Sequence, residues 1–294
     1  MNPHPHEKNV LRHLRLLGTP IALPTPQDVD EVLPRRGRGA MLFDFYSPEA
    51  VEEALDRYGV TPKLHARGFG ETAVELETAD PEHQVVRVRG RKDGHTYLLG
   101  EAFLHTGVWT TTAPFAERLR NREVPLLFIQ WLRLQDPTRP FGPDRPRLPG
   151  QDHPGLGVGR EVVRMFLGMA ERLHLGGIAS CPEFAHNAVL YETVFRFFDP
   201  AVQGRFDALR DACAGLTLAE LAWAVETERV VEDSTGTPVR WSRDEMICPT
   251  GDALREHLES REYRERMTAA KMACRLHVVP HTPVADEPDK RNHR

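Results

Sequence analysis

A glycine-rich turn that runs straight into an amphipathic segment is the feature of this sequence best suited to chemistry. The turn reads Pro154-Gly155-Leu156-Gly157-Val158-Gly159-Arg160, and apolar residues then recur every three or four positions up to Leu173. That period predicts a helix. The first N–H groups of a helix lack partners and lie at the positive end of its dipole, so they attract anions. Glycines at alternate positions let such groups curl round a phosphate, although a plain turn stays an alternative.

Two common phosphate-binding patterns do not fit this turn. A P-loop needs Gly-Lys-Ser/Thr, and this sequence does not follow Gly159. A dinucleotide fingerprint needs glycine at its first, third and sixth positions, whereas the sixth position from Gly155 is Arg160. If the turn holds a phosphate, it must do so in another way.

An amide and a phenol follow further along, in Asn187-Ala188-Val189-Leu190-Tyr191-Glu192. Residues 178–181 are apolar and end at Pro182, which is typical of a buried strand. We predict a second helix over 183–194 and a strand over the aromatic residues 195–198. From the residues alone, Tyr191 is either a core aromatic or a functional phenol. Asn187 is either a helix cap or a ligand contact.

Together the two segments resemble the GCN5-related N-acetyltransferase (GNAT) family. Its first motif is Arg or Gln, two residues, Gly, one residue, then Gly or Ala, often with an additional Gly. The glycines are matched by Gly155, Gly157 and Gly159, whereas Pro154 replaces the Arg or Gln and removes one contact to the pyrophosphate. Its second motif is matched by Asn187, Ala188, Leu190, Tyr191, Glu192 and Phe195, with Val194 where glycine is usual. The resemblance covers residues 155–198.

The resemblance implies an acyl-coenzyme A, most simply acetyl-CoA, as co-substrate, and no metal. The cofactor-binding residues that it implies are Gly155, Gly157, Val158, Gly159, Arg160 and Asn187. Backbone N–H groups of the turn would hold the pyrophosphate, and Asn187 would contact the cofactor arm or order its helix. In this family two central strands splay apart, so that the arm pairs like an extra strand. The acceptor, an amine on a small molecule or a peptide, would attack the thioester directly.

Tyr191 is the catalytic residue that the resemblance implies, because a phenol within reach of sulfur can protonate the departing thiolate. A backbone N–H of the strand predicted over 124–135 would stabilise the oxyanion. A general base is not identified, and Glu101, His105 and Glu123 are candidates near the ends of predicted strands. Cys181 would allow a covalent route, but its apolar neighbours favour an inert, buried thiol.

Composition narrows the class of protein. The 294 residues are 40% hydrophobic and 28% charged, which is ordinary for a soluble globular protein. A net charge of −5 argues against a dedicated nucleic-acid binder. The 4 cysteines are widely spread and contain no CxxC pair, which indicates reduced thiols. No apolar run reaches membrane-spanning length and no secretory signal is visible, so we expect a cytoplasmic protein. A homodimer is left open.

The elements that must position these residues follow an α+β order. Ser47, Pro48 and Glu49 predict a helix start, and Gly59 ends that helix. Residues 41–46 look like a strand. From residue 72 the period is that of strands, and Asp93-Gly94 predicts a hairpin between two of them. This order fits a GNAT-like fold, with a mixed, mainly antiparallel central sheet flanked by helices.

The predicted organisation has four parts. An N-terminal segment over 1–40 is partly irregular, and a GNAT-like acyl-CoA-binding domain covers 41–199. A mainly helical extension covers 200–280, and a disordered tail covers 281–294. A Pro-rich insertion over 136–153 separates the central strand from the glycine turn, which the family keeps close together. Long loops are often functional, so this one is either a wall over the acceptor site or a tolerated insertion.

Two functions of different kinds fit this sequence. The first is an acyl-CoA-dependent acyltransferase, most simply an N-acetyltransferase. The second is a non-catalytic acyl-CoA-binding or regulatory module on the same fold, which Pro154 and the insertion favour. A weaker third reading makes the resemblance local and assigns the activity to residues 200–280.

Overall fold

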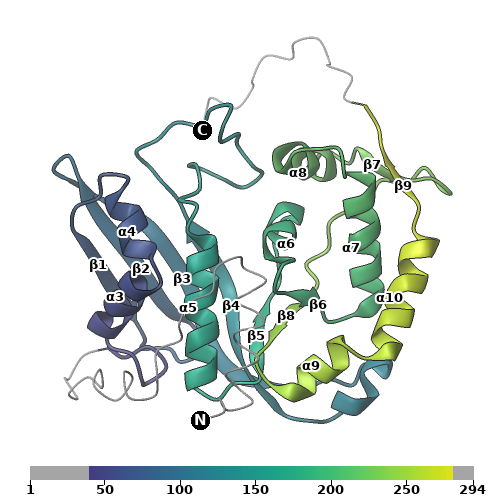
Figure 1. The fold of residues 1–294 in the computed structure, drawn as a ribbon, viewed down its shortest axis with the longest axis horizontal. Helices are drawn as coiled ribbons and strands as arrows, with labels where there is room; N and C mark the ends of the chain where they lie inside the picture. The colour runs from purple at the N-terminus through teal and green to yellow at the C-terminus, as the bar shows by residue number, and fades with distance from the viewer. Residues whose placement is uncertain (1–39, 281–294) are drawn as a thin grey trace, which may run out of the picture.

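A computed structural model describes residues 40–280, which form a seven-stranded mixed sheet flanked by helices (Figure 1). The strand order is β1-β2-β3-β4-β5-β8-β6. Every neighbouring pair is antiparallel except β4 and β5, which run parallel. The predicted fold class, mixed α+β with a mainly antiparallel sheet, is thus confirmed. The tail predicted over 281–294, and residues 1–39 of the predicted N-terminal segment, lie outside the described residues.

The first helices form where the local sequence predicts. Helix α3 (Pro48–Arg57) begins at Ser47, whose hydroxyl accepts a hydrogen bond from the Ala50 N–H, and α4 (Val60–His65) follows Gly59 at φ 84°. The strand predicted over 41–46 is wrong. Phe43 and Asp44 both have φ 55°, and Leu42 pairs with Tyr46 to close a tight turn instead.

Four antiparallel strands lead to the site. They are β1 (Thr72–Glu77), β2 (Gln84–Lys92), β3 (His95–Trp109) and β4 (Val124–Leu134). The turn between β2 and β3 contains Asp93 and Gly94 at φ 50° and 78°, so the predicted hairpin is confirmed. A short 3₁₀ helix, η1 (Pro114–Leu119), lies between β3 and β4.

A second series of elements carries the two predicted motifs. Helix α5 (Gly159–Arg172) begins inside the glycine turn and leads to β5 (Gly177–Ser180). Helix α6 (Ala185–Tyr191) is shorter than predicted, and β6 (Arg196–Phe197) follows it. In Figure 1, α5 crosses the middle of the sheet and α6 stands beside it.

Residues 200–280 add four helices and three strands within the described chain. They are α7 (Pro200–Ala212), α8 (Leu218–Glu226), β7 (Val230–Glu232), β8 (Met246–Pro249), α9 (Asp252–Leu258), α10 (Arg261–Ala273) and β9 (Leu276–Val278). Strand β8 lies between β5 and β6, so this part of the chain completes the main sheet. Strands β7 and β9 form a separate two-stranded sheet.

Alternate residues of the central strands bury against opposite layers. Ile178 and Met246 join the large core under α3, α5 and α7, whereas Ala179 and Ile247 join a smaller core under η1 and α9. Both sides of β5 and β8 are therefore covered, which fits their continuous apolar sequences. No helix in residues 40–280 has the length and apolar character needed to cross a membrane.

Candidate functional site

The base of the insertion is closed, so β4 and the glycine turn are adjacent despite the long loop between them. The Asp136 N–H donates to the Pro154 carbonyl at 2.7 Å, and the Leu156 N–H donates to the Leu134 carbonyl at 3.3 Å. Gln135 forms an antiparallel bridge with Gly155. The loop over 136–153 therefore leaves and rejoins the sheet at one point. These bonds place the end of β4 directly beside the glycine turn.

The glycine turn leaves the start of α5 open. Gly157 has φ 65°, a conformation that favours glycine, and a Cβ placed on Gly159 would meet no atom within 4 Å. Val158 is the N-cap and provides no side-chain acceptor. Within residues 40–280, no acceptor receives the N–H groups of residues 157–161. Consecutive unpaired donors beside empty space are what an anion site requires.

An arginine from a distant segment lies against this turn. Arg67 follows α4, and its Nη2 is 3.4 Å from the position that a Cβ on Gly157 would occupy. Its Nη1 is buried without a hydrogen-bond partner, and its ion pair with the Asp136 carboxylate is long, at 3.6 Å. Burial and the charge of Arg145 lower the pKa of Arg67. This guanidinium is only partly compensated, so an anion at the turn would stabilise it.

Further cations surround the same point. Arg145 donates from Nη1 to the Gly155 carbonyl at 2.9 Å, and Arg139 lies 3.7 Å from the Asp136 carboxylate. Lys92 donates to the Arg67 carbonyl at 2.9 Å and to the Thr138 hydroxyl at 3.2 Å. The fully buried Asp136 is the only carboxylate that pairs with any of these four cations within the described chain. We call Arg67, Lys92, Arg139 and Arg145 the basic cluster.

One acidic residue in the first turn of α5 opposes this charge. Glu161 is buried, but its carboxylate pairs with the Lys63 ammonium at 2.8 Å. The pair offsets the negative charge, so the basic cluster and the helix dipole dominate at the turn.

The parallel strands β4 and β5 separate close to the turn. Their pairing begins at Leu126 with Gly177 and ends at Ile129 with Ser180, although β4 continues to Leu134. The Ser180 hydroxyl donates to the Ile129 carbonyl at 3.2 Å and closes the last paired position. A bulge shifts the β3–β4 register at Gln130, immediately beyond this point.

The separated part of β4 presents unused backbone groups. Gln135 donates to Leu99 on the β3 side, whereas the Leu134 carbonyl accepts from Leu156 on the opposite side. By the alternation of a strand, the N–H and carbonyl of Leu132 also face away from β3. β5 supplies no partner there. An extended ligand could therefore pair with β4 in the position that β5 leaves.

Helix α6 carries both residues of the second motif on one face. Asn187 and Tyr191 are four positions apart, and neither side chain makes a hydrogen bond with a described residue. Phe184 is the N-cap, so the reading of Asn187 as a helix cap is wrong. Burial raises the pKa of the Tyr191 phenol, which keeps it protonated at neutral pH. The turn follows β4 and α6 follows β5, so both lie at the same end of the parallel pair.

The insertion connects the start of α6 to α8. Gly150 has φ 73°, and a Cβ there would overlap the Phe184 ring at 2.4 Å. Trp223 of α8 donates from Nε1 to the Arg147 carbonyl at 2.8 Å. The loop therefore forms a wall that reaches from the basic cluster to α6 and α8, as Figure 1 shows above the start of α5.

None of the three candidate bases is available at the separation of β4 and β5. Glu101 pairs in register with Arg133 in the separated part of β4, but its carboxylate is engaged by Arg87 at 2.9 Å and by Arg133 at 3.1 Å. Glu123 is exposed and precedes β4, at the end remote from the separation. The His105 ring stacks on the Phe128 ring at 4.5 Å, and its Nδ1 is buried without a hydrogen-bond partner. Burial lowers the pKa of His105.

A carboxylate that the sequence did not reveal lies at the end of β5. Glu245 precedes Met246, which pairs with Ser180, so it sits beside the residue that follows β5. It accepts a hydrogen bond from Trp109 Nε1 at 2.9 Å, and burial raises its pKa.

Cys181 is exposed, which corrects the expectation of a buried thiol. Partial burial and the charge of Glu245 raise the thiol pKa, so the less nucleophilic protonated form is favoured.

Comparisons with known proteins add no family to this geometry. No protein-family model matches the chain, and a search of curated proteins finds no match. Within residues 40–280, no group of three or more His, Cys, Asp or Glu side chains is arranged to hold a metal ion.

A buried histidine and a half-buried glutamate predict opposite dependences of stability on pH. Burial lowers the pKa of His186 to about 4 from 6.5, and burial raises the pKa of Glu171 to about 7 from 4.5. The His186 contribution is present above pH 6.5 and is lost as the pH falls towards 4. The Glu171 contribution is present below pH 4.5 and is lost as the pH rises towards 7. Each contribution to the unfolding free energy amounts to about 3 kcal/mol. The two changes have opposite signs, so they largely cancel where the two pH ranges overlap.

Single substitutions should separate the two effects. Relative to the parent protein, the unfolding free energy of Glu171→Gln should rise with pH between 4.5 and 7. That of His186→Phe, which keeps a ring on Phe184, should fall with pH between 4 and 6.5. Urea denaturation across this range measures both differences. Difference curves that stay flat would contradict the assignment.

Proposed function

We propose that the protein is a GNAT-like acyltransferase that transfers an acetyl group from acetyl-CoA to an amine. The open start of α5, with Arg67 beside Gly157, is the observation that carries the proposal. The separated β4 and β5, and the shared face of Asn187 and Tyr191, support it. The order of helices and strands from α3 to β6 also agrees with a GNAT-like fold.

The pyrophosphate would bind to the N–H groups of residues 157–160. Pro154 removes the side chain that the family motif supplies, and Arg67 offers a replacement from another segment. Each charge-assisted hydrogen bond contributes ~1.5–3 kcal/mol. Lys92, Arg139 and Arg145 would add attraction for the remaining phosphate of coenzyme A, because among the described residues Asp136 is the only carboxylate that pairs with the basic cluster.

The pantetheine arm would pair with β4 beyond Ile129, along the backbone groups of Leu132 that face away from β3. Asn187 of α6 would hydrogen-bond the arm. The thioester would then lie near the bulge at Gln130, where the register shift turns backbone N–H groups away from the regular ladder. Such an N–H would stabilise the developing oxyanion.

In the transfer, the amine nitrogen forms a bond to the thioester carbon and the bond from carbon to sulfur breaks. Glu245 would accept the proton lost by the amine, because burial raises its pKa and makes the carboxylate a stronger base. Tyr191 would donate a proton to the departing sulfur and be reprotonated from solvent. Direct transfer fits the protonated state favoured at Cys181 better than a covalent route does.

The alternative of a non-catalytic acyl-CoA-binding module is favoured by one observation, the loss of the motif side chain at Pro154. Calorimetry with acetyl-CoA tests binding first, and release of free thiol with a panel of small amines and peptides tests transfer second. Binding without thiol release would favour the module, and absence of binding would contradict both.

A substitution of Tyr191 predicts a specific kinetic change. Tyr191→Phe should lower kcat by about 10²–10⁴-fold, the range for loss of a general acid, and leave the acetyl-CoA Kd within twofold. Tyr97→Phe, a half-buried phenol on β3, is the control and should retain full activity. Undiminished turnover of Tyr191→Phe would remove this residue from the mechanism.

A further inference from the structure

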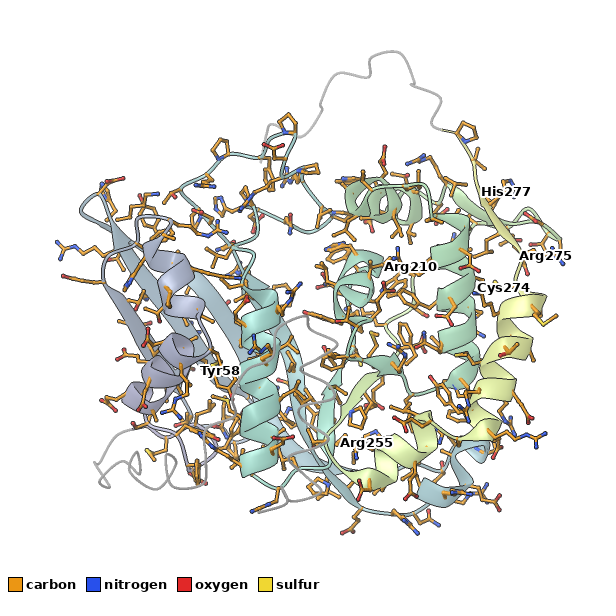
Figure 2. The ribbon with its side chains drawn as sticks, viewed as in Figure 1. Tyr58, Arg210, Arg255, Cys274, Arg275 and His277 are labelled. Carbon is orange, nitrogen blue, oxygen red and sulfur yellow. The ribbon has the colours of Figure 1, made fainter. Side chains whose placement is uncertain are left out.

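A cavity of about 250 Å³ lies in the C-terminal part of the protein, apart from the glycine turn. Its walls come from β6, α7, the segment 237–242 and the chain around β7 and β9. In Figure 2, the labelled Cys274, which lines it, marks the side where α10 and α7 meet. None of the residues assigned above to acyl transfer lines this cavity.

Trp241 gives the cavity a partly exposed aromatic ring. Phe197 and Phe206 are buried, and their ring centroids lie 6.2 Å and 6.3 Å from that of Trp241, so they support the indole from behind. A planar ring in the cavity could therefore make an offset or edge-to-face contact with Trp241.

The cavity is held open by contacts that do not need a ligand. Trp241 donates from its indole Nε1 to the Pro182 carbonyl at 2.9 Å, which fixes the ring. The Val239 N–H donates to the Val230 carbonyl at 2.7 Å and ties the lining segment to β7. A preorganised apolar surface lowers the entropic cost of binding.

One cation at the cavity has no partner. Arg205 of α7 is exposed, and its guanidinium forms no ion pair or hydrogen bond with the residues that the structure describes. Two other charged groups line the cavity. Arg240 pairs with Glu228 at 3.1 Å, whereas Glu232 accepts from the neutral Thr235 hydroxyl at 3.0 Å and keeps its charge. Arg205 is therefore free to bind a carboxylate through its paired donors.

We propose that this cavity binds a small aromatic carboxylate, with its ring against Trp241 and its carboxylate on Arg205. The volume suits one ring with a short acidic side chain, and the unpaired guanidinium gives the preference for an acid. This inference does not rest on acyl transfer, so it stands whether or not the protein binds acetyl-CoA.

Fluorine-detected NMR with 4-fluorophenylacetate tests the proposal on the full chain. We expect saturable binding at millimolar concentration and a shift of the Trp241 indole N–H resonance. The chain has 4 tryptophans, so the resonance is assigned by its loss in Trp241→Phe, and the Trp109 indole, which donates to Glu245, should not move. Binding that moves other resonances but not that of Trp241 would overturn the site.

Matched variants and a neutral probe test the role of charge. Arg205→Gln should weaken binding about tenfold or more, as expected for loss of a charge-assisted hydrogen bond. Arg261→Gln, which removes the same charge from an exposed helix position on α10, should leave it unchanged. The neutral 4-fluorophenylacetamide should bind the parent protein about tenfold more weakly. Equal binding to Arg205→Gln, equal binding of the amide, or no binding of the acid would each overturn the proposal.

Discussion

Gly157→Trp is expected to abolish acetyl-CoA binding, with a loss of more than about a hundredfold in affinity. The indole would distort the backbone N–H donors of the turn and fill the space that the phosphates need. Gly157 has φ 65°, which a bulky residue adopts only with strain. A side chain there would also grow towards Arg67, whose Nη2 is already 3.4 Å from the Cβ position. Isothermal titration calorimetry with acetyl-CoA measures the effect.

The backbone strain itself has a matched control in Gly236→Trp. Gly236 has φ 66°, almost the same as Gly157, and a Cβ there meets no atom within 4 Å. It lies in the turn after β7, away from α5. This variant should share the loss of stability and keep acetyl-CoA binding. Equal affinities for the two variants and the parent protein would show that the turn does not hold the cofactor.

Arg67→Met is expected to weaken acetyl-CoA binding between about tenfold and a hundredfold, the range for one or more charge-assisted hydrogen bonds. The remaining affinity should depend less on salt, because a partly buried cation has been removed from the site. Loss of the guanidinium also leaves Asp136, which is fully buried, with fewer partners. We therefore expect a fall in unfolding free energy of about 1–3 kcal/mol.

A second variant separates the two consequences of removing Arg67. In Arg67→Met with Asp136→Asn, the buried carboxylate is gone, so stability should recover while acetyl-CoA binding stays weak. Arg57→Met is the matched control, because Arg57 pairs with Glu53 on the surface of α3. It should bind acetyl-CoA like the parent protein. Recovery of binding in the double variant would assign Arg67 a purely structural role.

Local patterns in the sequence predicted the elements well where short-range physics decides. The Ser47 cap, the Asp93-Gly94 hairpin and the glycine turn all form as their residue types require. The prediction of a strand over 41–46 was wrong, because two of these residues adopt the left-handed backbone conformation, which their apolar sequence does not indicate. The length of α6 was overestimated, because its apolar residues continue into a turn that leads to β6.

The candidate site was only partly predictable, because distant segments complete it. Arg67 reaches Gly157 from the end of α4, and Asp136 and Arg145 come from an insertion whose closure depends on bonds from Asp136 to Pro154. The arginines of that Pro-rich segment were a weak signal, because Asp136, Asp144 and Asp152 balance their charge in the sequence. Glu245 could not be found, since β8 enters the sheet between β5 and β6, a long-range pairing that no local pattern marks.

A crystal structure of the protein with acetyl-CoA tests the central claim most directly. We predict that the diphosphate lies within hydrogen-bonding distance of the N–H groups of residues 157–160, and that the Arg67 guanidinium contacts it. Phosphates bound elsewhere, with those donors still unoccupied, would contradict the account.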